Sequence, residues 1–316
     1  MDKTFIYIEN TSNDPYFNQA FEEYIFNNYT EGDIFLLWRN RPAVVCGCYQ
    51  NIFAEVNAIE AEAADVALIR RISGGGTVYH DLGNINYSMI VSKEDLELNY
   101  EMFLEPMVRA LNRIGAPVSI NRKSDISIDG LKVSGSAQKA TMRRILHHGT
   151  LLYDCDLSVL SALSNGQRPH FETKGVASVP WPVTNIRPHM ADQSMSTEEF
   201  EAAILSSIAE EYTIERRELS DEELAEVREL AKSKYQSWDW TFGKSPSFIC
   251  RSNFVLDGTE TSLEYSSKKG VIEEIAFAPA VPELEEALTG RRLDMDEIKE
   301  LLSSYEGYSE IYKYIF

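Results

Sequence analysis

The sequence contains no long apolar run. No segment of its 316 residues approaches the eighteen or so apolar residues that a membrane-spanning helix needs. Residues 1–15 become polar before any stretch typical of a signal peptide develops. We therefore expect a cytoplasmic protein that does not bind membranes.

Cysteine is scarce. The four cysteines, at positions 46, 48, 155 and 250, form no CxxC pair and have no histidine at metal-ligand spacing, so we expect reduced, mostly buried thiols.

Basic residues are outnumbered by acidic ones, and the formal net charge is −20. This charge argues against a general binder of nucleic acid or of anionic membranes, because both functions require a broad basic surface.

The charge that is present is unevenly distributed. Residues 122–152 contain six lysines or arginines and two aspartates, whereas residues 197–232 contain twelve acidic and four basic residues. A positive segment in an otherwise acidic protein indicates a pocket for a small polyanion.

The front of the chain alternates helical and strand patterns. Asp14 and Pro15 predict the start of a helix. Residues 34–38 and 43–47 are short apolar strand candidates, which we expect to be joined as a hairpin. Repeated alanine and glutamate predict a further helix over residues 53–66.

The middle of the chain is dominated by strand patterns. Alternating apolar residues predict a strand over residues 84–92, followed by a helix over residues 107–115. An Asp-Gly pair predicts a hairpin over residues 125–138, and residues 143–154 continue as another strand. These hairpins predict an α+β fold, with helices flanking a mixed or antiparallel sheet, rather than a doubly wound parallel sheet.

Residues 237–248 separate two differently patterned parts of the chain. Before them lie helical patterns, one of which begins at a capping box that starts with Ser220. After them come three strand patterns and two acidic helices. Because the segment contains glycine and proline, we interpret it as a linker with a hinge near residues 243–247. The predicted domains are therefore residues 1–243 and a small α/β domain over residues 247–316.

Gly74, Gly75 and Gly76 form the most unusual cluster in the sequence. Three consecutive glycines allow a ligand to approach closely and let N–H groups point at an anion, although a tight turn would need the same residues. Neither standard nucleotide motif applies, because Tyr79 stands where GxGxxG has its last glycine and GxxxxGK[ST] is absent. Arg71, beside the glycines, offers forked contacts to phosphate or carboxylate, with a solvated arginine as the alternative.

Lys132 lies in a second candidate segment, residues 124–152. It follows the Asp-Gly turn in a strand pattern, where a lysine can point outward or inward. Small residues follow at positions 134–136, and two histidines lie on the next strand pattern. These neighbouring residues favour a ligand-binding role for Lys132 over that of an ordinary surface lysine. His80, after the glycines, could bind a ligand or fix the turn.

Several motifs together resemble the lipoate-protein ligase A family. They are “RRISGGGTVYHDLGN”, “DGLKVSGSAQ”, “HHGTLL” and “KGVASV” followed by “VTNI”, in this order along the chain. The tail after residue 248 also resembles that family's C-terminal accessory domain. The resemblance implies the fold shared by biotin and lipoate ligases, with a small accessory domain added.

The resemblance also implies a two-step reaction. Lipoate and ATP, with Mg²⁺, would give lipoyl-AMP and pyrophosphate, and a lysine of an acceptor protein would then displace AMP. The implied acceptors are lipoyl domains of 2-oxoacid dehydrogenases and the glycine cleavage H protein. We expect a monomer that binds no nucleic acid.

The family's functional residues can be carried over by motif position. Lys132 would be the catalytic lysine, in contact with both the lipoyl carbonyl and the phosphate. Asp125 could orient Lys132 or bind the metal ion, with a buried structural carboxylate as the alternative. The ATP or adenylate site would comprise Arg71, Gly75, Gly76, Thr77, Val78, Tyr79 and Lys132. The lipoate site would comprise Gly74, His80, His148 and Lys132, with Val44, Val78 and Leu151 as candidate walls.

The sequence departs from the family pattern in three places. Pro180, Trp181 and Pro182 stand where the family commonly has Arg-Ser-Arg, which puts the cationic contacts of this adenylate-binding loop in doubt. Trp181 could instead stack on adenine. Cys48 replaces a frequent arginine, and Ser124 replaces a frequent asparagine.

Two other functions remain open. One is an octanoyl or lipoyl transferase of the same fold that works without ATP through a cysteine thioester, for which Cys155 is the candidate. The other is a protein that binds lipoate or nucleotide without catalysis. Retention of Lys132 and of the glycine cluster argues against the second alternative.

Overall fold

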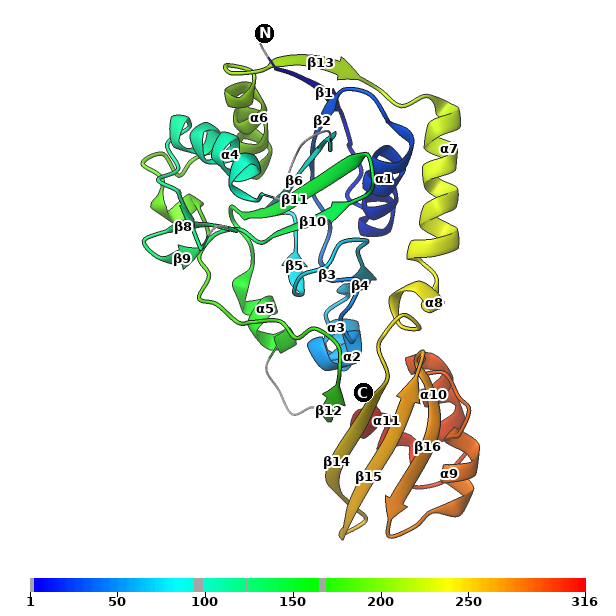
Figure 1. The fold of residues 1–316 in the computed structure, drawn as a ribbon. Coiled ribbons are helices and arrows are strands. Elements are labelled where there is room, and N and C mark those ends of the chain that lie inside the picture. Colours follow the sequence, from blue (N-terminus) through cyan, green and yellow to red (C-terminus); the bar gives the residue numbers. More distant parts are fainter. Residues whose placement is uncertain (1–2, 94–98, 123, 165–168) are drawn as a thin grey trace.

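A six-stranded mixed sheet forms the centre of the protein, which is represented here by a computed structural model (Figure 1). The structure describes residues 3–93, 99–122, 124–164 and 169–316, so Lys123 of the basic segment lies outside the described residues. The strand order is β10-β11-β6-β2-β1-β13. The β1 strand pairs in parallel with β2 and β13, and the other pairs are antiparallel. The strands are β1 (Thr4–Ile8), β2 (Asp33–Trp38), β6 (Asn84–Ser92), β10 (Ser136–Ala140), β11 (Arg144–Leu152) and β13 (Thr213–Arg217).

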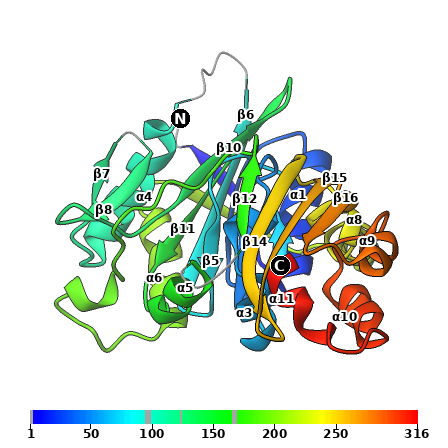
Figure 2. The same cartoon turned by 90° about the horizontal axis from the view of Figure 1, so that it is seen from below.

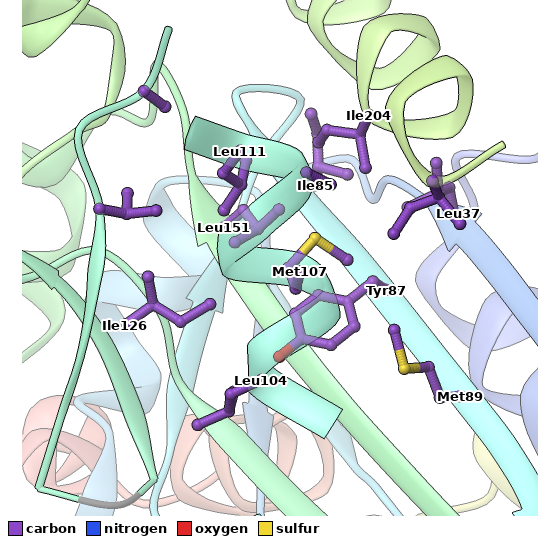
Figure 3. Packing of buried hydrophobic residues seen from close by; sticks show 14 of the residues in the cluster. Leu37, Ile85, Tyr87, Met89, Leu104, Met107, Leu111, Ile126, Leu151 and Ile204 are labelled. Atoms are coloured by element: carbon purple, nitrogen blue, oxygen red, sulfur yellow. The ribbon is translucent and has the colours of Figure 1, made fainter. Parts of the chain in front are cut away.

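Helices cover both faces of this sheet. One face packs against α4 (Glu101–Arg113) and α6 (Thr197–Ile208), and Figure 3 shows Met107, Leu111 and Ile204 of these helices meeting Ile85 and Tyr87. The other face packs against α1 (Pro15–Asn28), α7 (Asp221–Leu230) and the π-helical turn Ala231–Tyr235. The sheet is therefore buried on both sides, and the predicted α+β fold with helices flanking a mixed sheet is confirmed.

Two three-stranded sheets lie beside the main sheet and carry the candidate motifs. The first has the order β4-β3-β5, and the second has the order β7-β8-β9. In the second, Asp129 and Gly130 have φ values of 50° and 80°, as the predicted Asp-Gly hairpin turn requires. The strands are β3 (Ala43–Cys46), β4 (Ala67–Arg70), β5 (Val78–His80), β7 (Ser119–Asn121), β8 (Asp125–Ile128) and β9 (Leu131–Lys132).

The tail of the chain forms a fourth sheet with its own helices. Its strand order is β12-β14-β15-β16, seen side by side in Figure 2. The β12 strand comes from earlier in the chain, and Phe53 packs in the same apolar cluster. The predicted small C-terminal α/β unit is present, whereas the two domain boundaries stay predictions. The elements are β12 (His170–Thr173), β14 (Phe248–Leu256), β15 (Thr259–Lys268), β16 (Val271–Ala278), α9 (Pro282–Leu288), α10 (Met295–Ser303) and α11 (Tyr312–Ile315).

Two local predictions were wrong. The β2 and β3 strands form no hairpin, because β2 pairs with β1 and β6 while β3 pairs with β4 and β5. The single helix predicted over residues 53–66 is divided into α2 (Ile52–Glu55) and α3 (Ala58–Ala63). The Asn57 side chain accepts the N–H groups of Ile59 and Glu60 and so starts a new helix.

The remaining helices and the thiols complete the description. They are α5 (Leu157–Ser164), α8 (Trp238–Thr241) and the 3₁₀ turns Arg187–His189 and Ser309–Ile311. None of the helices in the described part of the chain has the length and apolar content to cross a membrane. All four cysteines carry free thiols, and Cys48 alone among them is partly exposed, which confirms the expected reduced and mostly buried thiols.

Candidate active site

A cavity of about 280 Å³ lies where the main sheet meets the glycine segment. Its walls come from β2, β5, β6, β10 and β11, from Lys132 at the end of β9, and from the segment 177–179. Trp38, His80 and His148 are at most 8% exposed, whereas the Lys132 side chain is 26% exposed. The lining residues are Gln19, Trp38, Val45, Arg71, Gly76, Thr77, Val78, His80, Asn86, Lys132, Gly135, Ser136, Ala137, His148, Gly149, Thr150, Ala177, Ser178 and Val179. Lys132 therefore marks the open end of the cavity.

Arg71 shapes the glycine loop from inside the protein. Its guanidinium donates to the carbonyl oxygens of Gly74 at 2.6 Å and Gly76 at 2.7 Å. It also donates to the Val45 carbonyl oxygen and to the Ser73 hydroxyl. These contacts fold the loop around the guanidinium, and a Cβ atom added at position 75, where φ is +90°, would lie only 3.0 Å from it.

Lys132 is held at the cavity by a carboxylate and by two strand contacts. Its Nζ atom lies 2.8 Å from Oδ1 of Asp125, which stands on the neighbouring strand β8. Its backbone N–H donates to the Pro182 carbonyl oxygen, and its own carbonyl oxygen accepts the Thr184 N–H. The segment around residue 182, which departs from the family pattern, is therefore a direct neighbour of the lysine.

A buried polar chain forms the closed end of the cavity. His148 Nδ1 lies 2.9 Å from both carboxylate oxygens of Glu22, and its Nε2 lies 2.6 Å from the Ser73 hydroxyl. The Ser88 hydroxyl donates to Glu22 and accepts the indole N–H of Trp38. Sequence reasoning missed Glu22, Ser73 and Trp38. The available signal was the glutamate directly after Phe21 on the predicted core-facing helix.

His80 presents an unused nitrogen in the same region. Its Nδ1 lies 2.9 Å from the Asn40 side-chain amide nitrogen, while Nε2 is buried without a partner among the described residues. Because the amide nitrogen can only donate, Nδ1 accepts and Nε2 carries the proton. Burial lowers the pKa of His80 to about 3, and the charges of Arg71 and His148 add to this effect. His80 is therefore a neutral donor.

Ser178 ties the segment 174–179 across the cavity. Its hydroxyl donates to Glu55 and accepts the Thr77 N–H at 2.8 Å and the Gln50 side-chain N–H at 3.1 Å. The Gln50 side-chain oxygen also accepts from the Thr77 hydroxyl and from the Gly47 N–H. Glu55, Gln50 and Ser178 were not predicted, and Ser178 had stood out only as part of the quoted “KGVASV”.

Other predicted residues lie outside the cavity wall. Tyr79 and Val44 pack together in a separate apolar cluster, and Leu151 lies in the core shown in Figure 3. Gly74 and Gly75 belong to the loop that Arg71 holds, but they are not among the lining residues. Of the three candidate walls, the structure thus brings only Val78 to the cavity.

Cys155 is placed away from the cavity. Its backbone N–H and carbonyl group both bond to the Asn185 side chain. Burial raises the pKa of the Cys155 thiol, and the charge of Asp81 adds to this effect. A buried thiol with a raised pKa is a poor nucleophile.

The described residues contain no group of three or more histidine, cysteine, aspartate and glutamate side chains that could hold a metal ion by itself. Asp125 is the carboxylate that stands beside Lys132. One carboxylate is sufficient where Mg²⁺ is bound mainly through substrate phosphates.

The fold and the cavity define a protein with a deep, partly cationic site for a small ligand. The sequence matches the family described as “Lipoyl protein ligase A/B catalytic domain” over residues 14–209. A relative named lipoate–protein ligase 1, from Staphylococcus aureus, is 33% identical over an alignment of 307 positions that covers 95% of this chain and 93% of the relative. The chain therefore belongs to the lipoyl protein ligase A/B family, as its motifs predicted.

Solved structures agree with this fold over most of the chain. P. falciparum LipL1 in complex with lipoate covers 96% of this chain and 95% of its own, with a TM-score of 0.65 and 20% identity. A lipoate-protein ligase A bound with ATP covers 77% of this chain and 99% of its own, with a TM-score of 0.61 and 24% identity. The first of these likenesses includes the C-terminal part of the chain.

Proposed function

We propose that this protein attaches lipoate to a lysine of acceptor proteins at the expense of ATP, through a lipoyl-AMP intermediate. The observation that carries the proposal is the position of Lys132. Its ammonium lies at the open end of the cavity, whose wall also includes Gly76 of the glycine loop that Arg71 holds. Family membership and the relative's name support this choice of reaction.

The first step joins two anions. A carboxylate oxygen of lipoate attacks the α-phosphorus of ATP, the bond from that phosphorus to the bridging oxygen breaks, and pyrophosphate leaves. Lys132 stabilises the approach, because its ammonium can contact both the carboxylate and the α-phosphate. Asp125 orients the ammonium and would contribute to holding Mg²⁺, which neutralises phosphate charge when bound.

Lipoate would lie with its ring toward the closed end of the cavity. Trp38, Val45, Val78 and Ala137 supply the apolar surface there, and the His80 Nε2–H supplies a donor. The carboxylate then reaches Lys132, and the ATP phosphates lie between Lys132 and the glycine segment. The segment 177–179 covers this position and would shield the mixed anhydride from water.

In the second step, the amine of an acceptor lysine attacks the lipoyl carbonyl carbon. The bond to the AMP oxygen breaks, AMP leaves, and the amine loses a proton to water. Lipoyl domains of 2-oxoacid dehydrogenases and the glycine cleavage H protein are the proposed acceptors. A cytoplasmic location and a monomeric state stay predictions from the sequence. The buried position of Cys155 gives no support to a thioester route.

Lipoate-dependent exchange of labelled pyrophosphate into ATP tests the proposal. Wild-type protein should catalyse exchange, Lys132→Ala should reduce the rate by about 10²-fold or more, and Cys155→Ala should retain it. Acyl transfer that needs Cys155 and proceeds without ATP would refute the proposal. So would a wild-type protein that binds lipoate but shows neither exchange nor ligation.

A further inference from the structure

Arg122 is stacked on the indole ring of Trp181. The Arg122 Cζ atom lies 3.3 Å from the ring centre, a separation that places the guanidinium flat on the ring. The five N–H groups of a guanidinium point outward in its own plane, so stacking uses none of them. Arg122 is exposed and, within the described part of the chain, has no carboxylate or carbonyl partner. Its donors are free for a ligand.

The stacked pair lies beside the Lys132–Asp125 ion pair. Trp181 precedes Pro182, whose carbonyl oxygen accepts the Lys132 N–H at 2.9 Å. The residue before Arg122 faces Asp125 across the β7–β8 pair. Trp181 is therefore next in sequence to the residue that bonds to Lys132, and Arg122 is next in sequence to the residue that pairs with Asp125.

The arginine and the lysine that line the cavity already have protein partners. Arg71 donates to three carbonyl oxygens and one hydroxyl, and Lys132 is paired with Asp125. A triphosphate nevertheless brings several negative charges, and the pyrophosphate that leaves must be stabilised. A guanidinium with free N–H groups matches a phosphate in geometry and charge.

We propose that Arg122, seated on Trp181, contacts the β- and γ-phosphates of ATP during adenylation. The inference rests on the proposed function, because it takes ATP as the substrate. It also gives a role to residues 180–182, which carry no positive charge. The Trp181 ring stacks on the Arg122 guanidinium and so orients this cation, which follows β7.

Calorimetric titration with ATP and with AMP tests this role without requiring catalysis. Arg122→Gln should raise the Kd for ATP about tenfold, as expected for the loss of a charged hydrogen bond, and leave the Kd for AMP unchanged. Arg143→Gln is the matched control. Arg143 is an exposed arginine of the same basic segment, at the far turn of the β10–β11 hairpin, and its change should leave both constants unchanged.

Two further measurements separate Arg122 from a structural residue. Arg122→Gln should raise the KM for ATP and slow pyrophosphate exchange, but transfer from preformed lipoyl-AMP to an acceptor should continue at the wild-type rate. Trp181→Leu should weaken ATP binding in wild-type protein, and add little in the Arg122→Gln background.

Three results would overturn the inference. They are ATP binding by Arg122→Gln within twofold of wild type, equal losses for ATP and AMP, and a matching loss of transfer from preformed lipoyl-AMP. Failure of the proposed function would look different, because wild-type protein itself would then show no lipoate-dependent exchange.

Discussion

Arg71 and Lys132 bring positive charge to the cavity in different ways. Arg71 is buried, and its bonds to loop carbonyls determine the shape of the glycine segment. Lys132 is partly exposed, and its ammonium has Asp125 as a partner. Because an ammonium carries three donors, Lys132 retains N–H groups for a ligand. The loop geometry thus depends on Arg71, whereas Lys132 has donors available for the substrate contacts that we propose.

His147 is a neutral histidine inside the main core. Its ring is stacked on Phe103 with 4.8 Å between ring centres, and its Nδ1 lies 3.0 Å from the Gln138 side-chain nitrogen. Burial lowers the pKa of His147 to about 3, and the charge of His148 adds to this effect. Folding therefore holds this imidazole in its uncharged form.

We predict that His147 makes folding sensitive to mild acid. Below about pH 6.5 the unfolded histidine takes up a proton, whereas the folded one stays neutral down to about pH 3. The unfolded state binds more protons in this window, so stability falls as the pH falls. One such histidine contributes a loss of about 1 kcal/mol between pH 7 and 5.5.

Urea unfolding of wild type and His147→Phe at these two pH values checks this prediction. The phenylalanine keeps a ring against Phe103. Any change that it makes in packing alters the free energy of unfolding equally at both pH values, and so does not affect the change in stability with pH. On acidification from pH 7 to 5.5, the free energy of unfolding of the variant should fall by about 1 kcal/mol less than that of wild type. Equal losses for the two proteins would contradict the prediction.

At the scale of elements, the Ser178 side chain is a main contact of the segment 174–179. Its hydroxyl joins Gln50 and Glu55, which are five residues apart, to the Thr77 backbone in another part of the chain. A hydrogen bond to a charged group contributes about 1.5–3 kcal/mol. The Ser178 hydroxyl therefore contributes to the closed position of the segment, together with the backbone bonds from Val176 to Tyr49 and from Ser178 to Glu55.

Ser178→Ala should open this segment and expose the mixed anhydride to water. Loss of the hydroxyl bond to Glu55 raises the open population by about tenfold, whereas the backbone N–H of residue 178 keeps its bond to Glu55. We expect more AMP released for each lipoylated acceptor, and faster tryptic cleavage after Lys174. Ser194→Ala is the control, since Ser194 is exposed and bonds only locally to Asp192. An unchanged ratio of AMP to lipoylated product would count against the prediction.

The elements also show how far the sequence could predict the fold. The β6 strand and the turn at Asp129 and Gly130 follow from local patterns, and both were predicted. The pairing of β2 was not, because an apolar strand buried on both faces carries no mark of its neighbours. Local chemistry thus determines which segments become strands, whereas strand partners depend on distant contacts.

The candidate site likewise contains residues that the local sequence indicates and residues that only distant contacts reveal. Lys132 and the glycine loop are prominent in the sequence because lysine and consecutive glycines are unusual in their surroundings. Glu22 and Glu55 are ordinary glutamates in helical patterns, and each becomes notable only through contacts more than a hundred residues away. The position of Glu22 directly after Phe21 on a core-facing helix was a weak local signal, whereas no local pattern distinguishes Glu55 from a solvated glutamate.

At the scale of the whole molecule, Arg70 joins the β4-β3-β5 sheet to the linker. Its guanidinium is fully buried and donates to the Thr241 carbonyl oxygen, the Ser245 hydroxyl and the Gln50 carbonyl oxygen. Its own carbonyl oxygen accepts the indole N–H of Trp240. The two adjacent arginines thus hold different segments: Arg71 bonds to the glycine loop, and Arg70 bonds to the linker.

Arg70 adds to the cost of motion at the hinge that the sequence predicts near residues 243–247, where the pairing of β12 with β14 also holds the two parts together. A rotation there would pull Ser245 away from the buried guanidinium and separate Phe248 from Phe53, whose ring centres are 5.6 Å apart. Leaving a buried charged donor without its partner costs about 1–3 kcal/mol or more. The ligand-free protein should therefore keep the C-terminal sheet against the core, as in Figure 2.

Small-angle scattering of wild type and Arg70→Met checks this prediction. Wild-type protein without ligand should match the compact arrangement, and the variant should show a larger radius of gyration, because no charge then holds the linker. Arg109→Met is the control, since Arg109 pairs with Glu211 on the distant surface of α4. Circular dichroism shows whether each variant is folded. Identical profiles for folded wild type and Arg70→Met would mean that Arg70 is not needed to restrain the hinge, and that the β12–β14 pairing and the packing of Phe53 on Phe248 are sufficient.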